Sequence, residues 1–62
     1  MIEIEDISYV EVTDSTSFKC TFTKSGYRIT FPSALPGELT EAQIVAEMQD
    51  EYNNWIERNN IP

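Results

Sequence analysis

The chain has 62 residues, enough for one small domain spanning residues 1–62 and too few for two hydrophobic cores. One cysteine and no histidine exclude an internal disulfide and a Cys/His zinc site. Eleven acidic residues against four basic ones give a net charge of −7, which argues against unaided binding to nucleic acids or anionic membranes. Because so small a domain is expected to be marginally stable, a protein partner or self-association is its remaining source of support.

The sequence has no pattern typical of export or membrane insertion. No apolar run approaches the roughly 20 residues of a transmembrane helix, and the first residues lack the organisation of a signal peptide. A free thiol fits a reducing compartment. Short acidic chains of this shape also occur among phage accessory and virion proteins, a purely compositional analogy. We therefore expect a cytoplasmic location or a place in a virus particle.

The first third of the chain predicts a β-strand over about residues 2–12. Its isoleucine, valine and tyrosine residues favour extended structure, and the segment Thr13–Thr16 that follows has the composition of a turn. Unbroken alternation would place Val10 and Val12 on the core face of the next strand.

The same alternation places Ile7 and Tyr9 out of phase with the two valines. Two interpretations stay open. Either both side chains form an apolar patch on an uncovered sheet face, or a β-bulge between Glu5 and Ser8 resets the register and buries them.

The middle of the chain alternates between apolar and polar residues and predicts a hairpin. Its apolar positions, which we expect to face the core, are Phe18, Cys20, Phe22, Tyr27, Ile29 and Phe31. Placing them in register needs a loop with an even number of residues, either Lys24–Ser25 or Thr23–Gly26. Both loops put Phe22 opposite Tyr27.

A helix over 41–58 has signals at both ends. Thr40 and Gln43 match a capping box, and Ile61 is placed to contact Ile56 in a Schellman motif before the terminal proline. The apolar positions of this helix fall within a single arc of about 120°. They are Ile44, Val45, Met48, Tyr52, Trp55 and Ile56.

These elements predict an α+β domain of order β-β-β-α. A three-stranded antiparallel meander is followed by one C-terminal amphipathic helix, which packs on one face of the sheet and leaves the other face open. The expected elements are strands at about 2–12, 17–23 and 27–31, an extended linker over 32–39 and a helix over about 41–58.

Groups that carry catalysis are poorly represented. There is no histidine, Cys20 belongs to the expected core, and carboxylate pairs such as Glu47 and Glu51 lie on a solvated helix face. Neither glycine is surrounded by the oxygen ligands of a calcium loop. We therefore expect a protein that is not an enzyme and has no metal site and no cofactor.

The leading hypothesis is a protein-protein interaction module that docks into a larger assembly, such as a viral particle or its accessory machinery. It would use strand one, which lies at an edge of the sheet, and the open sheet face. Its candidate contact residues are Ile2, Ile4, Ile7 and Tyr9.

The alternative is a small acidic inhibitor that mimics nucleic acid and occupies the basic site of a nucleic-acid-binding protein. Its candidate residues on the acidic helix face are Glu47, Asp50, Glu51 and Glu57. The competing explanation is that these carboxylates only keep a small domain soluble.

Overall fold

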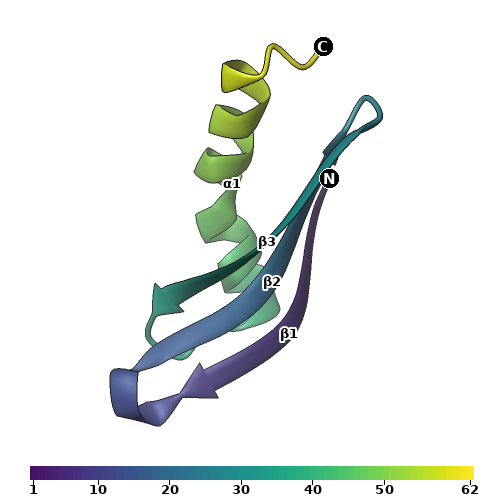
Figure 1. Ribbon diagram of the computed structural model, residues 1–62. Helices are drawn as coiled ribbons and strands as arrows, with labels where there is room; N and C mark the ends of the chain where they lie inside the picture. The colour runs from purple at the N-terminus through teal and green to yellow at the C-terminus, as the bar shows by residue number, and fades with distance from the viewer.

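A computed structural model describes residues 1–62 and shows an α+β fold with one open sheet and one helix (Figure 1). The elements are β1 (Ile2–Val10), a 3₁₀ turn η1 (Glu11–Thr13), β2 (Ser15–Lys24), β3 (Tyr27–Pro36) and α1 (Glu41–Arg58). The strands are antiparallel in the order β1-β2-β3, and α1 contacts the sheet. The predicted β-β-β-α meander is confirmed.

Both predicted ends of α1 are confirmed. The backbone N–H of Gln43 donates to the Thr40 hydroxyl at 3.2 Å, and the Thr40 N–H donates to the Gln43 side chain at 2.9 Å. At the other end, Asn60 adopts a left-handed conformation and the Ile61 N–H donates to the Ile56 carbonyl at 3.0 Å. This is the Schellman arrangement, and it buries Ile61.

The β2–β3 turn differs from the prediction. Its two central residues are Ser25 and Gly26, both with positive φ (52° and 84°), as a type I′ turn requires. The loop is even, as predicted, but Phe22 lies opposite Ile29 instead of Tyr27. A loop centred on Lys24–Ser25 would leave the glycine outside the turn, where its freedom at positive φ is wasted.

Strand β3 is longer than predicted. Residues 32–36, expected as part of an extended linker, pair with the start of β2, where Pro32 lies opposite Lys19 and Pro36 opposite Ser15. Two prolines fit this strand because it is an edge strand, on which every second N–H points away from the sheet.

Strand β1 contains the one-residue bulge that one interpretation of its irregular alternation predicted, but the burial that this interpretation also predicted is wrong, because Ile7 and Tyr9 are 43% and 37% exposed. The pairing with β2 shifts between Glu5 and Ser8, and Asp6 has a φ of 54°. Beyond the bulge, Tyr9 pairs with Thr16 and therefore points to the same side of the sheet as the helix.

Val10 and Val12, which unbroken alternation would place on the core face, do not face the core. Val10 pairs with Ser15, which alternates with the core residues of β2, so Val10 lies on the open face. Val12 lies in η1 and is 96% exposed.

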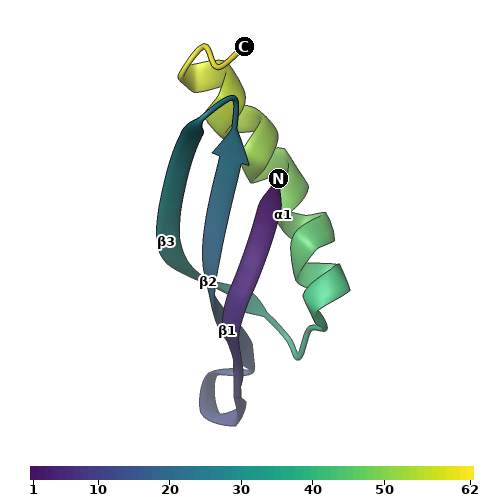
Figure 2. The ribbon, with the colours of Figure 1, turned by 90° about the vertical axis from the view of Figure 1, so that its right-hand side faces the viewer.

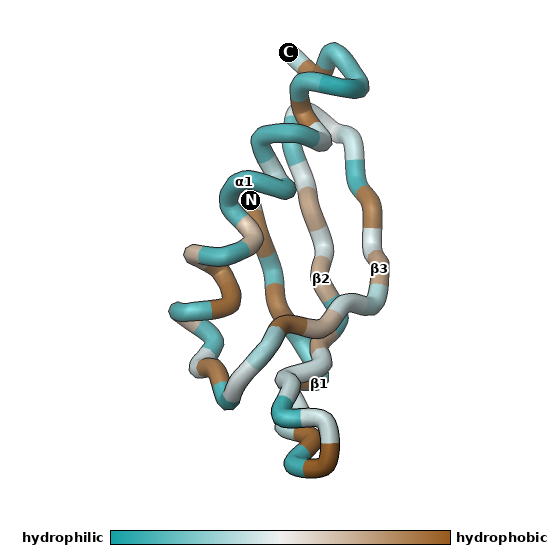
Figure 3. The backbone as a smooth tube through the Cα atoms, turned by 90° about the vertical axis from the view of Figure 1, so that its left-hand side faces the viewer, coloured by the Kyte–Doolittle hydropathy of each residue, from teal (hydrophilic) through white to brown (hydrophobic).

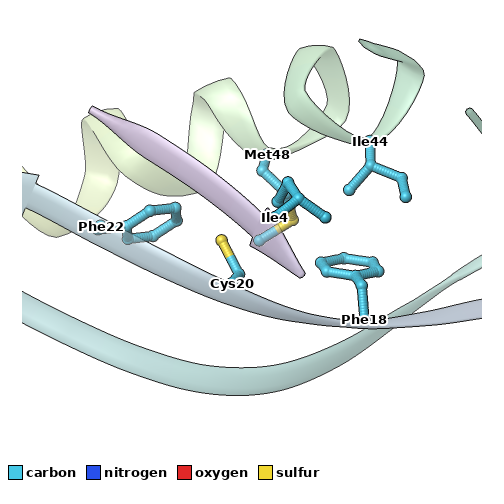
Figure 4. Packing of buried hydrophobic residues seen from close by; sticks show 6 residues of the cluster. All are labelled: Ile4, Phe18, Cys20, Phe22, Ile44 and Met48. Atoms are coloured by element: carbon cyan, nitrogen blue, oxygen red, sulfur yellow. The ribbon is translucent and has the colours of Figure 1, made fainter. Parts of the chain in front are cut away.

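The core lies between α1 and the sheet (Figure 4). Its buried members come from β1, β2 and α1 and are Ile4, Phe18, Cys20, Phe22, Ile44 and Met48. Phe22 also contacts Tyr52 and Trp55, with ring centroids 5.3 and 5.7 Å apart. These aromatic contacts extend the core along the second half of the helix.

The helix does not cover the whole of one sheet face. Its first half lies beyond β1, on the side away from β2, and its C-terminal end lies near the β2–β3 turn (Figures 2 and 3). Tyr27 and Ile29 point to the helix side of β3 yet are 54% and 41% exposed. They were expected in the core, and this offset of the helix explains why they are not.

Candidate interaction surface

The outer half of the β1–β2 hairpin projects beyond the helix. The molecule is elongated, with extents of 40 × 17 × 16 Å, and the end of the hairpin forms one tip of the long axis (Figures 1 and 2). Because α1 does not reach this end, apolar side chains of the hairpin there have no layer above them.

Four apolar residues share this projecting end, and we call them the hairpin surface. They are Ile7, Tyr9, Val10 and Val12. Tyr9, the least accessible, is still 37% exposed. Tyr9 points to the helix side of the sheet and Val10 to the open face, so the projecting end exposes apolar side chains on both of its sides, more than the single exposed apolar residues common in folded proteins.

The backbone of this hairpin is held in place by polar contacts. Asp14 has a φ of 47°, and its carbonyl accepts a hydrogen bond from the Gly37 N–H at 2.8 Å. The Tyr9 hydroxyl donates to the Asp14 carboxylate at 2.7 Å, and the Thr13 and Ser15 hydroxyls lie 2.7 Å apart. The exposed apolar side chains are therefore presented by a fixed turn, which lowers the entropy lost on binding.

The hydrogen bond between Tyr9 and Asp14 also changes the acidity of the phenol. It raises the pKa of Tyr9 above its usual value, with smaller contributions from burial and from the charges of Asp14 and Glu38. Acidic groups therefore border the hairpin surface.

The predicted contact residues divide into two groups. Ile4 is buried in the core and Ile2 packs against it, so neither belongs to the exposed surface. Ile7 and Tyr9 do belong to it, although they do not point to the open face as the leading hypothesis required.

Sequence reasoning missed the contribution of Val10 and Val12 to this surface. The available signal was the turn composition of the segment that follows Val12, because side chains at a turn have few neighbours to cover them.

The open face of the sheet is mainly polar. It carries the hydroxyls of Thr21 and Thr30, 2.9 Å apart, and the ammonium of Lys19, which lies 3.4 Å from Glu5 and 3.9 Å from Asp6. The contacts of Lys19 with Glu5 and Asp6 are the two ion pairs in the structure.

The acidic helix face is fully exposed. Glu47, Asp50, Glu51 and Glu57 all lie on the outer side of α1, and none of them forms an ion pair. The one base of the helix, Arg58, donates to the carbonyl of Asn54 at 3.4 Å instead. The four carboxylates therefore form a strip of unbalanced negative charge.

The structure brings no recognised catalytic group together. It contains no cluster of three histidine, cysteine or acidic side chains that could hold a metal ion. Cys20 is completely buried, and burial raises the pKa of its thiol, which disfavours the reactive thiolate. The structure also contains no helix that is both long enough and apolar enough to cross a membrane.

Comparison of the chain with protein-family models, with curated proteins and with solved structures finds no match.

Proposed function

We propose that this protein is a non-catalytic interaction module that docks into a larger assembly through the hairpin surface. The observation that carries the proposal is the exposure of Ile7, Tyr9, Val10 and Val12 on a hairpin that projects beyond its own helix. The setting we propose is a virus particle or its accessory machinery.

The charges around the hairpin surface define the partner that fits it. Glu11 and Asp14 lie in the turn itself, and no base lies within the first 18 residues of the chain. The partner would therefore offer an apolar pocket for Val12 and Tyr9, bordered by lysine or arginine side chains. The apolar contacts supply the affinity that persists at high salt, and the charges speed association.

The test is to capture partners with tagged protein from a lysate of the source cell or particle, with washes of increasing salt and identification by mass spectrometry. Wild type is compared with Val12→Asp and with Asn53→Asp, which adds the same charge on the exposed side of α1. We expect one protein to be retained at high salt by wild type and Asn53→Asp and lost by Val12→Asp. The captured protein is then purified and titrated against all three variants.

Val12 makes this test independent of folding, because a side chain 96% exposed contributes little to the core. The circular dichroism spectrum of Val12→Asp should therefore match that of wild type. Equal affinity of Val12→Asp and wild type for the purified partner would contradict the proposal.

A second candidate, inhibition of a nucleic-acid-binding protein, rests on the acidic helix face. Its four carboxylates have no basic partner in the chain and extend over about 15 Å of the helix axis. This function predicts a partner that moderate salt releases and that Glu47→Lys, Glu51→Lys no longer binds. If that double variant binds as wild type does, the inhibitor function is excluded.

A further inference from the structure

The outer edge of β1 is free for pairing at two residues. Thr23 N–H donates to the Met1 carbonyl at 3.0 Å, and the Met1 amine donates to the Thr23 carbonyl at 2.6 Å. In an antiparallel ladder the residues on either side of such a pair point their backbone groups the other way. Ile2 and Ile4 therefore direct their N–H and C=O groups away from the sheet.

The outer edge of β3 is free over a similar length. Because the backbone groups of Thr23 face β1, those of its neighbours Phe22 and Lys24 face β3, where they meet Ile29 and Tyr27. It follows that Arg28 and Thr30 direct their backbone groups outward.

Each free edge ends after a few residues. On β1 the bulge at Asp6 breaks the regular pairing pattern after Glu5. On β3 the ring of Pro32 replaces the next outward N–H. The two edges that remain, residues 2–5 and 27–31, have closely similar lengths.

Apolar side chains lie beside both of these edges. The first half of α1 lies beyond β1 (Figures 2 and 3). An open groove of about 550 Å³ lies between them, lined by the apolar residues Ile2, Ile4, Ala42 and Val45 and by Glu3, Glu5 and Glu41. On β3, Tyr27 and Ile29 point to the same side of the sheet and are only partly covered, with 54% and 41% of their surface exposed. The molecule thus has an apolar groove at one edge of the sheet and partly exposed apolar side chains at the other.

The two edges are complementary in charge. Glu3 and Glu5 alternate with Ile2 and Ile4 on β1, whereas Arg28 alternates with Tyr27 and Ile29 on β3. By alternation the acids and the arginine point to the open face, and Glu3 and Glu5 also line the groove along the β1 edge.

We propose that copies of this chain assemble edge to edge, with β3 of one copy adding to β1 of the next in one continuous sheet. Ile29 would lie beside Ile4 and Tyr27 beside Ile2, in the groove beside α1, and Arg28 would lie beside Glu3. The added strand runs parallel to β1, since β1 and β3 run in the same direction and all helices stay on one side. The Arg28 and Thr30 N–H groups would donate to the carbonyls of Ile2 and Ile4.

A second copy fits these edges better in this arrangement than in a symmetric one. Pairing β1 with another β1 would bring the Glu3 and Glu5 rows of two copies together, and like charges on adjacent strands are destabilising. Pairing β3 with β3 would bring two Arg28 side chains together and leave both grooves empty.

A head-to-tail contact closes into a ring or continues as a filament. It leaves the hairpin surface free, so it is independent of the proposed docking function.

The first experiment measures the mass of the purified protein by analytical ultracentrifugation as its concentration is raised. We expect species larger than dimers for wild type. Arg28→Glu alone and Glu3→Lys alone should each weaken assembly at least about tenfold, because each brings like charges together. An equimolar mixture of these two variants should assemble again, since each β3 then meets a β1 of opposite charge. Arg58→Glu and Glu47→Lys make the same charge changes on α1 and should leave assembly intact.

The second measurement is amide hydrogen exchange, which measures the protection of the backbone N–H groups at the two edges. The N–H groups of Ile4, Arg28 and Thr30 point outward in the monomer and should gain protection as concentration rises. A wild-type protein that stays monomeric overturns the proposal, as does a closed dimer without larger species. Assembly that Arg28→Glu and Glu3→Lys leave unchanged overturns it too.

Discussion

The side-chain hydroxyl of Thr16 accepts a hydrogen bond from the backbone N–H of Leu39 at 3.0 Å. The same hydroxyl donates to the carbonyl of Gly37 at 2.6 Å. Thr16 lies in β2 and is buried, whereas the other two residues belong to the connection between β3 and α1. One side chain thus fastens the connection to the sheet one residue before the N-cap Thr40 and positions the start of the helix.

Replacing Thr16 by valine should therefore destabilise the domain although the two side chains have nearly the same shape. The change leaves a backbone donor and a backbone acceptor without their partner, which costs about 1–3 kcal/mol. Urea unfolding followed by circular dichroism measures this loss. Thr23→Val is the matched control, because Thr23 lies in the same strand and its hydroxyl makes no hydrogen bond. Equal midpoints for the two variants would show that Thr16 does not fasten the connection.

Tyr52 joins the helix to β2 and to Met1, the residue before β1. Its hydroxyl accepts from the Met1 amine at 2.5 Å and donates to the Thr23 carbonyl at 3.0 Å. Tyr52→Phe keeps the aromatic contact with Phe22 but removes both hydrogen bonds, and we expect a loss of about 1 kcal/mol in unfolding free energy. Tyr27→Phe, at an exposed tyrosine with no hydrogen bond, should leave the unfolding free energy unchanged. If both variants unfold at the same urea concentration, the contact adds no stability.

The hairpin turn should respond to alkaline pH through Tyr9. Its pKa in the folded state is raised by the hydrogen bond to Asp14, so the phenol keeps its proton to a higher pH than in the unfolded chain. The resulting stabilisation is complete below the usual tyrosine pKa of about 10 and is lost as pH rises through the higher folded value. Ultraviolet titration of the phenolates, compared with Tyr9→Phe, isolates this group.

Asp14→Asn tests the cause of this raised pKa. Asparagine tolerates the left-handed backbone at this position, so the turn should persist while the carboxylate is lost. The pKa of Tyr9 should then fall toward its ordinary value. Glu47→Gln, which removes one charge on α1, should leave the pKa of Tyr9 raised. A Tyr9 titration unchanged in Asp14→Asn would contradict the assigned cause.

Local signals allowed the helix to be predicted closely from the sequence. The capping box at Thr40 and the Schellman motif at Ile61 each depend on residues within a few positions of one another, and both are found as predicted. The strand order also follows from short connections. In contrast, alternation fixes only which residues share a face. It could not distinguish Phe22 opposite Tyr27 from Phe22 opposite Ile29, because both registers have the same parity.

The hairpin surface was predicted only in part because its exposure depends on where the helix lies. Tyr9 shares the helix side of the sheet with buried residues such as Phe18, and no property of its own sequence neighbours shows that α1 stops short of it. The same holds for Ile29 at the opposite edge. The lateral offset of a helix over a sheet is set by tertiary packing, here by Ile44 and Met48 against the core, which periodicity does not reveal.

Cys20 should react only when the domain opens. It has no exposed surface in the core, and burial raises the pKa of its thiol, so both access and thiolate formation are suppressed. Alkylation by iodoacetamide, read by mass spectrometry, should be slow in buffer and fast in urea. Because Cys20 is the only thiol in the chain, the ratio of the two rates reports how rarely the core opens. Equal rates would mean that the core is not formed in solution.

Asn60 is the residue that lets the chain turn back after α1. Its φ of 52° is tolerated by asparagine and glycine but strains a residue such as alanine. Asn60→Ala should therefore lower the unfolding free energy by about 1 kcal/mol relative to Asn60→Gly, because it opposes the turn that buries Ile61. Urea unfolding of the two variants measures the difference. Without the turn, Ile61 loses its buried position and the Pro62 carbonyl loses the hydrogen bond that the Ser25 hydroxyl donates at 2.7 Å. Identical unfolding curves would show that the end of the chain is not fastened by this motif.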